Sequence, residues 1–283
     1  MRTLVTISLF VLGLTGVAGA QGRAYPVSAN AILPSTVPTA PLSAWTEAPG
    51  RALLAVDGDG VSLRGWSFAG STPAAPTILY FGGNVARLLD EEPSLRAIAR
   101  RGPGVVAFDY RGYGFSTGQA DVMTMRRDAL RLFDATAARA GGPGHVVVFG
   151  FSMGTVFAAY VAAQRKVAGI ALVAAIADAV EEIPSYAKAS GFDFPGITLV
   201  PTPDAVEAFG EAALVAQSKA PLLVVHGEAD RVVPVVQGRE VFAASPATVK
   251  RLVVLPDVDH NGALAAAATL DALIAFVSAL PVK

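Results

Sequence analysis

The sequence predicts an α/β fold built on a mostly parallel, doubly wound sheet, and three observations indicate it. From Arg51 onward, short β-branched runs alternate with stretches of helical periodicity, the pattern of a sheet covered by helices on both faces. Four runs are almost wholly apolar, as strands buried on both faces are. The helical stretches repeat apolar residues every three or four positions. The four apolar runs are 77–81, 105–108, 145–149 and 167–173.

The remaining elements follow in chain order. A hairpin is expected at 52–56 and 61–68, because Asp57-Gly58-Asp59-Gly60 between them is rich in turn residues. Two more strands are expected at 222–226 and 251–255. Since single α/β domains often reach about 200 to 250 residues, we expect 51–283 to form one domain. The apolar helix faces comprise Leu130, Phe133 and Ala137; Met153, Val156, Phe157 and Tyr160; and Leu270, Leu273, Ile274 and Val277.

Composition excludes several classes of function. The formal net charge is −1, from 22 basic and 23 acidic residues, so nucleic-acid binding is disfavoured. The chain has no cysteine, which removes disulfides and a thiol nucleophile. Oligomeric state is left open by the sequence.

The first residues have the pattern of a secretory signal. Arg2 precedes an uncharged apolar run from Leu4 to Ala18, and Ala18-Gly19-Ala20 offers small residues at a signal-peptidase spacing. The alternative is an uncleaved anchor, but a membrane-spanning helix needs about 20 apolar residues and this run is shorter. We therefore expect residues 1–20 to be a cleavable signal peptide, with no stable membrane span, and the mature protein to be secreted or periplasmic.

Two segments fall outside the alternating pattern. Residues 21–50 are rich in proline, which predicts an extended N-terminal arm with no chemistry assigned to it. Residues 177–218 separate two strands by more than a crossover requires, and they contain large apolar residues such as Tyr186, Phe192 and Phe194. Long insertions of this kind are often lids, so we expect a short helical cap; the alternative is a disordered excursion.

Gly150-Phe151-Ser152-Met153-Gly154 matches the Gly-x-Ser-x-Gly pattern of a nucleophile. The pentapeptide follows an apolar strand and precedes an amphipathic helix, which is the setting that the motif needs. Small residues flank the serine because the turn is tight, and the N-terminus of the next helix favours an oxyanion at the same place. Ser152 is the predicted nucleophile; the alternative is a packing turn.

A serine hydroxyl needs a base, and the chain has three histidines. His145 begins the strand before the motif and is expected at the opposite end of the sheet. His226 ends a strand, and packing is its expected role. His260 lies between the last strand and the last helix, where loops at the carboxyl ends of strands converge, so it is the predicted base.

The acid that orients the base should also follow a strand. Asp230 does so, and the order Ser152, Asp230, His260 is the order that this kind of triad uses along the chain. The competing carboxylates are Asp178, Asp257 and Asp259, of which the last two are close neighbours of His260 in sequence.

An oxyanion needs two N–H donors. The residue after the nucleophile, Met153, supplies one, and the loop after strand 77–81, Gly82-Gly83-Asn84-Val85, is expected to supply the other from the Asn84 N–H. The alternative role for Asn84 is a helix N-cap.

Over residues 52–280 the chain resembles the serine hydrolases of the α/β-hydrolase superfamily, and within them the Bem46/ABHD17-like branch, which includes depalmitoylases. The resemblance rests on the stretches 79–84 and 108–116, on the serine pentapeptide, and on the Asp230 and His260 segments. It implies the α/β-hydrolase fold and gives Asp109 and Arg111 a supporting, non-catalytic role. Relatives usually have His-Gly-Asn where this chain has Gly82-Gly83-Asn84, so the loop has lost an imidazole that would help to hold it.

The resemblance implies hydrolysis of carboxylic or thio esters through an acyl-enzyme, with a small-molecule acyl ester as substrate and no metal or organic cofactor. A peptidase or amidase, or an acyltransferase, would use the same residues. A binding module that has lost activity is disfavoured because all three triad positions are filled. The sequence names neither the acyl chain nor the leaving group.

Overall fold

The computed structural model describes residues 23–34, 36–191 and 196–281. Its centre is an eight-stranded sheet in the order β10-β9-β7-β6-β4-β5-β3-β2. Strands β2 and β3 form the predicted hairpin, β3 pairs antiparallel with β5, and the other pairs are parallel. The strands are β2 (Ala52–Gly58), β3 (Val61–Phe68), β4 (Thr77–Phe81), β5 (Gly104–Phe108), β6 (Val146–Phe151), β7 (Gly169–Val173), β9 (Leu222–Gly227) and β10 (Lys250–Leu255).

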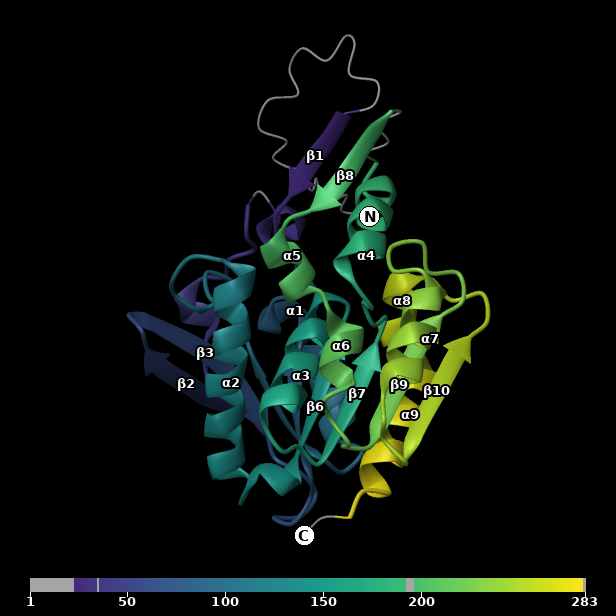
Figure 1. Cartoon of the computed structure of the whole chain (residues 1–283). Helices are drawn as coiled ribbons and strands as arrows, with labels where there is room; N and C mark the ends of the chain where they lie inside the picture. The colour runs from purple at the N-terminus through teal and green to yellow at the C-terminus, as the bar shows by residue number, and fades with distance from the viewer. Residues whose placement is uncertain (1–22, 35, 192–195, 282–283) are drawn as a thin grey trace.

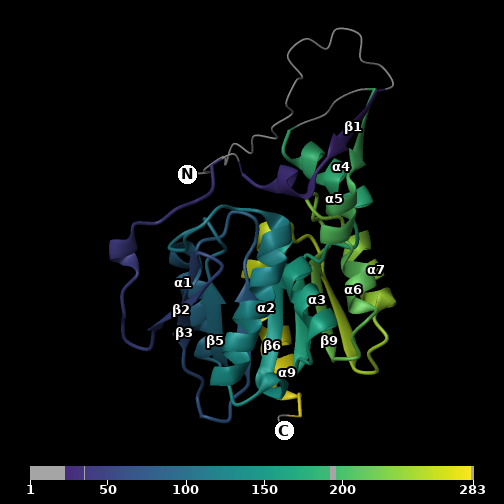
Figure 2. The ribbon, with the colours of Figure 1, turned by 60° about the vertical axis from the view of Figure 1, so that its left-hand side comes forward.

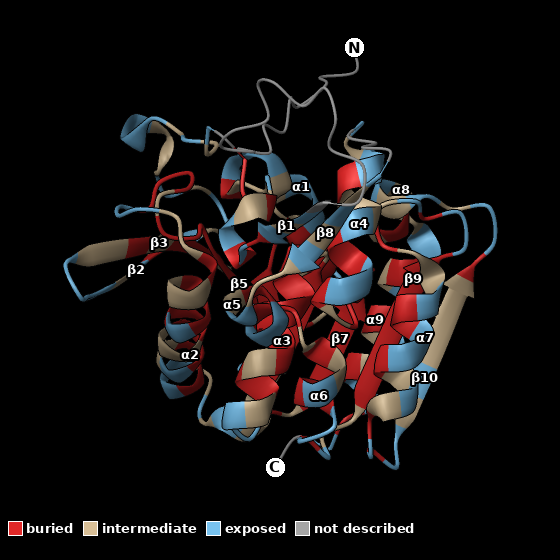
Figure 3. Ribbon diagram, turned by 45° about the horizontal axis from the view of Figure 1, so that its top comes forward, coloured by how far each residue is buried: buried red, intermediate tan, exposed pale blue. Residues whose placement is uncertain are grey.

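Helices cover both faces of this sheet (Figure 1). Alternate residues of one strand serve different cores, as the period of two requires: Leu79 and Phe81 pack with α2, α3 and α7, whereas Ile78 and Tyr80 pack with α1 and α9. The central strands are buried and the edge strand β10 is only partly so (Figure 3). These helices are α1 (Leu88–Ala99), α2 (Val122–Arg139), α3 (Met153–Gln164), α7 (Val235–Ala244), α8 (His260–Ala265) and α9 (Ala267–Ser278).

The predicted α/β-hydrolase fold, with its mostly parallel doubly wound sheet, is therefore confirmed, and the strand bounds differ from the prediction by a few residues. One correction concerns His145, which does not begin β6. It ends a short 3-10 helix, η3 (Pro143–His145), that precedes the strand. His145 still lies at the amino end of β6, away from Ser152.

The insertion 177–218 contains the helices α4 (Ala179–Ala189), α5 (Pro203–Ala208) and α6 (Glu211–Val215), and also the strand β8 (Ile197–Pro201). Much of the insertion, with α4 and α5, lies beyond the carboxyl ends of the parallel strands, whereas α6 packs beside α3 and α7 (Figure 1). The prediction of a helical cap missed the strand β8, because this strand exists only through its pairing with a distant segment. Residues 192–195 of the cap, with Phe192 and Phe194, lie outside the described residues.

The N-terminal arm contains the partner of β8. Strand β1 (Arg23–Val27) pairs parallel with β8 and forms a separate two-stranded sheet with it. Figure 2 shows β1 lying with the cap helices α4 and α5. The arm continues through η1 (Ala29–Ile32) and η2 (Leu42–Ala44), and Ala29, Ile32 and Leu33 join the main core. Thus the arm is part of the fold rather than only a leader into it.

The predicted signal peptide, residues 1–20, lies outside the described residues. Within the part of the chain that the structure describes, no helix combines the length and the apolar character that crossing a bilayer requires.

Candidate active site

Ser152 occupies a sharp turn between β6 and α3. Its backbone is at φ 52° and ψ −124°, a conformation that costs energy for a residue with a Cβ. The flanking glycines are required by space: a Cβ on Gly150 would collide with the backbone of Gly154 and Thr155, and a Cβ on Gly154 would collide with the carbonyl of Phe81. The structure thus bears out the steric reason for the small residues of the motif.

His260 joins the other two residues of the predicted triad. Its Nε2 lies 3.0 Å from Ser152 Oγ, and its Nδ1 lies 2.7 Å from Asp230 Oδ2. Because a carboxylate accepts, the Nδ1 carries the proton and the Nε2 is left to accept from the serine hydroxyl. His260 is the first residue of α8, and Phe151 packs its ring 5.1 Å from the imidazole centroid.

Asp230 is held in the loop that follows β9. Its Oδ1 accepts the backbone N–H groups of Val232 and Val233, each at 2.9 Å, which leaves Oδ2 for His260. The side chain is buried. The two N–H groups of this loop hold the carboxylate in place, so the group that orients the imidazole has a fixed position.

The competing residues are occupied elsewhere. His226 is fully buried, its Nε2–H donates to the Val233 carbonyl at 2.9 Å, and burial lowers the pKa of its imidazole. Asp178 caps α4 by accepting from Val180 and Glu181. Asp259 caps α8 by accepting from Gly262, and Asp257 occupies a turn at φ 58°. None of these carboxylates is hydrogen-bonded to His260 within the described residues.

Comparison with known proteins agrees with this geometry. The family model for the alpha/beta hydrolase fold matches residues 76–197. The uncharacterised protein YfhR of Escherichia coli O157:H7 is 30% identical over 208 residues, which are 71% of this chain and 70% of that protein. The chain belongs to the α/β-hydrolase superfamily.

Other members of the superfamily are also similar to this chain. The lysophosphatidylserine lipase ABHD12 of Xenopus tropicalis is 31% identical over 220 residues, 73% of this chain but only 55% of the lipase. Among solved structures, the esterase Pf2001 of Pyrococcus furiosus superposes with a TM-score of 0.65 over 88% of this chain and 99% of the esterase, at 17% identity. At that identity the likeness shows the fold alone.

The two predicted oxyanion donors belong to segments that lie next to Ser152. Met153 is the first residue of α3, so its N–H has no carbonyl within the helix to bond. Gly83 lies against the turn, since a Cβ on it would be 3.8 Å from Ser152 Cβ. Asn84 is not a helix N-cap, because α1 begins after Arg87. Its side chain instead contacts Tyr186 of the cap and Ile32 of the arm.

Asp109 and Arg111 have the supporting positions that the resemblance implied. Asp109 is buried and accepts the N–H groups of Leu88 and Phe115, each at 2.9 Å. Burial raises the pKa of this carboxyl to about 6. Arg111 forms a bidentate pair with Asp128, at 2.5 and 2.7 Å. Both residues fix the loop between β5 and α2 of the hydrolase fold.

Two cavities meet at the triad of this hydrolase. One, of about 560 Å³, is lined by Ser152, Asn84, Tyr186 and His260 among others. The other, of about 1110 Å³, is lined by Asp230, His260, Lys188 and Arg231 among others. His260 borders both cavities. Within the described residues, no cluster of three or more metal-binding side chains is present.

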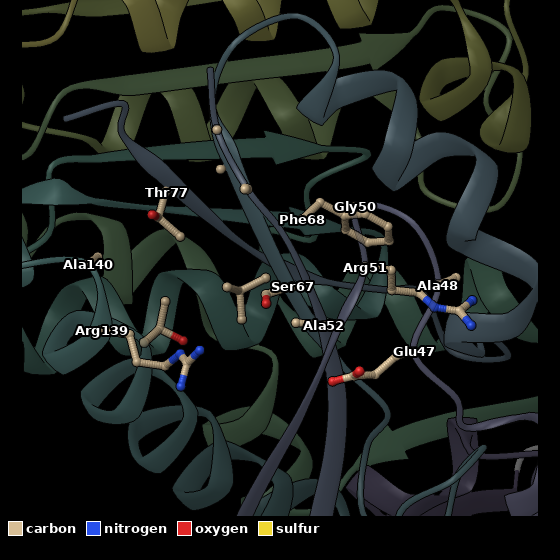
Figure 4. Close-up of a pocket in the computed structure, with 15 residues that line it drawn as sticks. Glu47, Ala48, Gly50, Arg51, Ala52, Ser67, Phe68, Thr77, Arg139 and Ala140 are labelled. Atoms are coloured by element: carbon tan, nitrogen blue, oxygen red, sulfur yellow. The ribbon is translucent and has the colours of Figure 1, made fainter. Parts of the chain in front are cut away.

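A third hollow, of about 650 Å³, lies at the opposite end of the parallel strands from the triad. It is lined by Thr77 and Gly104, which begin β4 and β5, whereas the triad follows the carboxyl ends of strands. Figure 4 shows Glu47 of the arm and Arg139 of α2 on different sides of this hollow. It holds none of the predicted site residues.

Two polar residues near the site, Glu211 and Tyr186, were not predicted from the sequence. Glu211, in the short helix α6, is fully buried and lies 2.6 Å from the Thr155 hydroxyl, which in turn lies 2.7 Å from the Ser152 carbonyl. The sequence indicates Tyr186 only as a large apolar residue of the cap. A glutamate at the start of a short helix is expected to be exposed, so no local sequence pattern indicated that Glu211 is buried.

Proposed function

We propose that this hydrolase cleaves carboxylic or thio ester bonds through an acyl-enzyme on Ser152, with His260 as general base and Asp230 as the acid that orients it. The observation that carries the proposal is the continuous pair of contacts at His260, 3.0 Å to Ser152 Oγ and 2.7 Å to Asp230 Oδ2. A base within hydrogen-bond distance of the nucleophile, itself oriented by a third group, is the arrangement that activates a serine.

In the first step, His260 Nε2 takes the Ser152 hydroxyl proton while Oγ bonds to the acyl carbon. The carbonyl oxygen becomes an oxyanion, for which the N–H groups of Met153 and Asn84 are the proposed donors. The bond to the leaving oxygen or sulfur then breaks, and the leaving group departs with the proton from His260. In the second step, water gives a proton to His260 Nε2 while its oxygen bonds to the acyl carbon. The bond between the acyl carbon and Ser152 Oγ then breaks, His260 returns the proton to Oγ, and the acid is released.

The comparisons support ester substrates over other acyl compounds. One of the relatives named above is a lipase, and two cavities flank His260. We assign the chain to the Bem46/ABHD17-like branch on the sequence stretches described above. We also propose that the protein is secreted or periplasmic, since residues 1–20 have the three regions of a signal peptide.

The test is turnover of nitrophenyl esters of increasing acyl length, each beside its matched nitroanilide. We expect ester turnover by the wild-type protein, a loss of roughly 10⁴ to 10⁶ in kcat for Ser152→Ala, and no comparable amide turnover. Preferred cleavage of the amides would favour a peptidase. Diversion of the acyl group to an added alcohol, in place of hydrolysis, would favour an acyltransferase.

A further inference from the structure

Three distant segments meet at the side chain of Asn84. Its Nδ2 donates to the Ile32 carbonyl of the arm and, at 2.9 Å, to the Tyr186 hydroxyl oxygen of cap helix α4. The Tyr186 hydroxyl donates in turn to the same Ile32 carbonyl, at 3.2 Å. The three groups therefore form a closed set of hydrogen bonds, which we call the Asn84 clamp.

The orientation of the amide follows from the partners. The Ile32 carbonyl can only accept, so the nitrogen of the Asn84 amide must face it; the reverse orientation would set two oxygens against each other. Burial raises the pKa of Tyr186 to about 12, so its hydroxyl keeps its proton and donates to Ile32. Hence Tyr186 accepts from Asn84, and each hydrogen in the clamp has an acceptor.

The clamp lies on the loop that faces the nucleophile. Gly83, the preceding residue, packs against Phe151 and Ser152. The Gly82 carbonyl of the same loop accepts a hydrogen bond from the Tyr110 hydroxyl at 2.6 Å. The backbone N–H and the side chain of Asn84 share one Cα, so a side chain held at two points restricts where the N–H can point.

From these contacts we infer that Tyr186 and the Ile32 carbonyl are positioning groups for the oxyanion loop, acting through the Asn84 side chain. The cap and the arm then contribute to the rate of the chemical step and not only to substrate binding. This inference rests on the proposed function, because it assigns a role in holding the oxyanion of that reaction.

A cap that only anchors or binds substrate would behave differently. Loss of an anchoring bond would lower stability, and loss of a substrate contact would raise KM. A positioning bond stabilises the transition state more than it stabilises the bound substrate, so its loss lowers kcat with little change in KM. Loss of a positioning bond also weakens binding of a trifluoromethyl ketone, because the hemiketal that this ketone forms with Ser152 Oγ carries its oxyanion at the same place.

The experiment is a double-mutant cycle between Tyr186→Phe and Asn84→Ala, measured with one nitrophenyl ester. We expect Tyr186→Phe to lower kcat by about 3- to 10-fold in the wild-type background, the range for one neutral hydrogen bond. In the Asn84→Ala background, the same change should cost less than about 2-fold, because the group through which it acts is gone. Tyr160→Phe, which removes a hydroxyl from α3, is the matched control and should leave kcat unchanged.

The trifluoromethyl ketone gives an independent readout on the single Tyr186→Phe variant, which keeps the ring. Its inhibition constant should rise by about the same factor as kcat falls. Equal losses in both backgrounds, an effect on KM alone, or an unchanged inhibition constant would each overturn the clamp. Ser152→Ala distinguishes failure of the proposed function from failure of the Asn84 clamp. If ester turnover survives Ser152→Ala, the proposed function is contradicted. If Ser152→Ala abolishes turnover but Tyr186→Phe leaves it unchanged, only the clamp is contradicted.

Discussion

Asp230 Oδ2 lies 2.7 Å from His260 Nδ1, and the other oxygen of the same carboxylate is held by two backbone N–H groups. This relationship fixes the tautomer in which Nε2 can accept the Ser152 proton. Because both carboxylate oxygens already have partners, Asp230 has no freedom to serve another group. Hydrogen bonding to Asp230 therefore sets which ring nitrogen of His260 faces Ser152.

We predict that Asp230→Asn lowers kcat for ester turnover by about 10³- to 10⁴-fold, because an amide in that place favours the wrong tautomer of His260. KM should change little. Asp178→Asn is the control, since Asp178 only caps α4 and should alter kcat by less than about 2-fold. Steady-state kinetics on both variants decides the assignment. The reverse pattern, with Asp178→Asn severely impaired and Asp230→Asn nearly normal, would refute it.

Glu211 makes stability depend on pH in an unusual direction. Burial raises the pKa of its carboxyl to about 8. Thr155 Oγ1 lies within hydrogen-bond distance of both the Ser152 carbonyl and Glu211 Oε2. The Ile176 N–H also donates to Glu211 Oε2, at 3.1 Å. These hydrogen bonds lower the pKa of the carboxyl, but burial is the larger effect, so Glu211 is protonated at pH 7.

The folded state therefore keeps this proton between about pH 4.5 and pH 8, whereas the unfolded state loses it, so the free energy of unfolding falls as pH rises through that window. The slope from this group approaches about 1.4 kcal/mol per pH unit. Urea unfolding at pH 5.5, 6.5 and 7.5 should show a flatter dependence for Glu211→Gln than for wild type. The exposed Glu228→Gln should keep the wild-type slope; an equally steep slope for Glu211→Gln would contradict a neutral Glu211.

Gly154→Ala should disrupt the turn that presents Ser152, because the added Cβ would collide with the carbonyls of Phe81 and Gly82. We expect the free energy of unfolding to fall by about 3 kcal/mol or more, seen as a lower Tm, and ester turnover to be at least about 10-fold lower. Gly141→Ala is the comparison. Its Cβ meets nothing within 4 Å at φ +83°, so only backbone strain is added and turnover should be normal. Wild-type turnover in Gly154→Ala would show that the turn tolerates bulk.

Expression with the intact leader should yield a secreted or periplasmic protein that begins at Gln21, because Ala18 and Ala20 have the small side chains that signal peptidase accepts. The intact mass of the exported protein measures this directly. Ala20→Phe should block cleavage and retain residues 1–20. A wild-type protein that keeps Met1 and Arg2 in the cytoplasm would contradict the assignment.

Local pattern was enough to predict the sheet and the relative placement of the triad residues. Strands such as β4 are short apolar runs, and the carboxyl ends of parallel strands meet at one edge, which is why Ser152, Asp230 and His260 converge. Non-local contacts were not predictable. Strand β1 pairs with β8 across about 175 residues, as the Ala29 bond to Asp204 illustrates, and neither strand has a strong pattern of its own.

The roles of Tyr186 and Glu211 were missed for a related reason. Helical periodicity indicates which face of a helix is buried, but not which polar group on another segment will meet it. Glu211 is buried because α6 packs against α3, and Tyr186 reaches Asn84 because the arm supplies the Ile32 carbonyl. Both depend on how segments far apart in the chain come together.

The most direct test of the central claim is reaction of the folded wild-type protein with a fluorophosphonate, followed by mass spectrometry of its peptides. An activated serine displaces fluoride and keeps the phosphonyl group. We predict one adduct per chain, located on Ser152, and none on Ser152→Ala treated in the same way. A wild-type protein that stays unmodified, or a Ser152→Ala variant labelled as fast as wild type, would contradict the claim that Ser152 is the nucleophile.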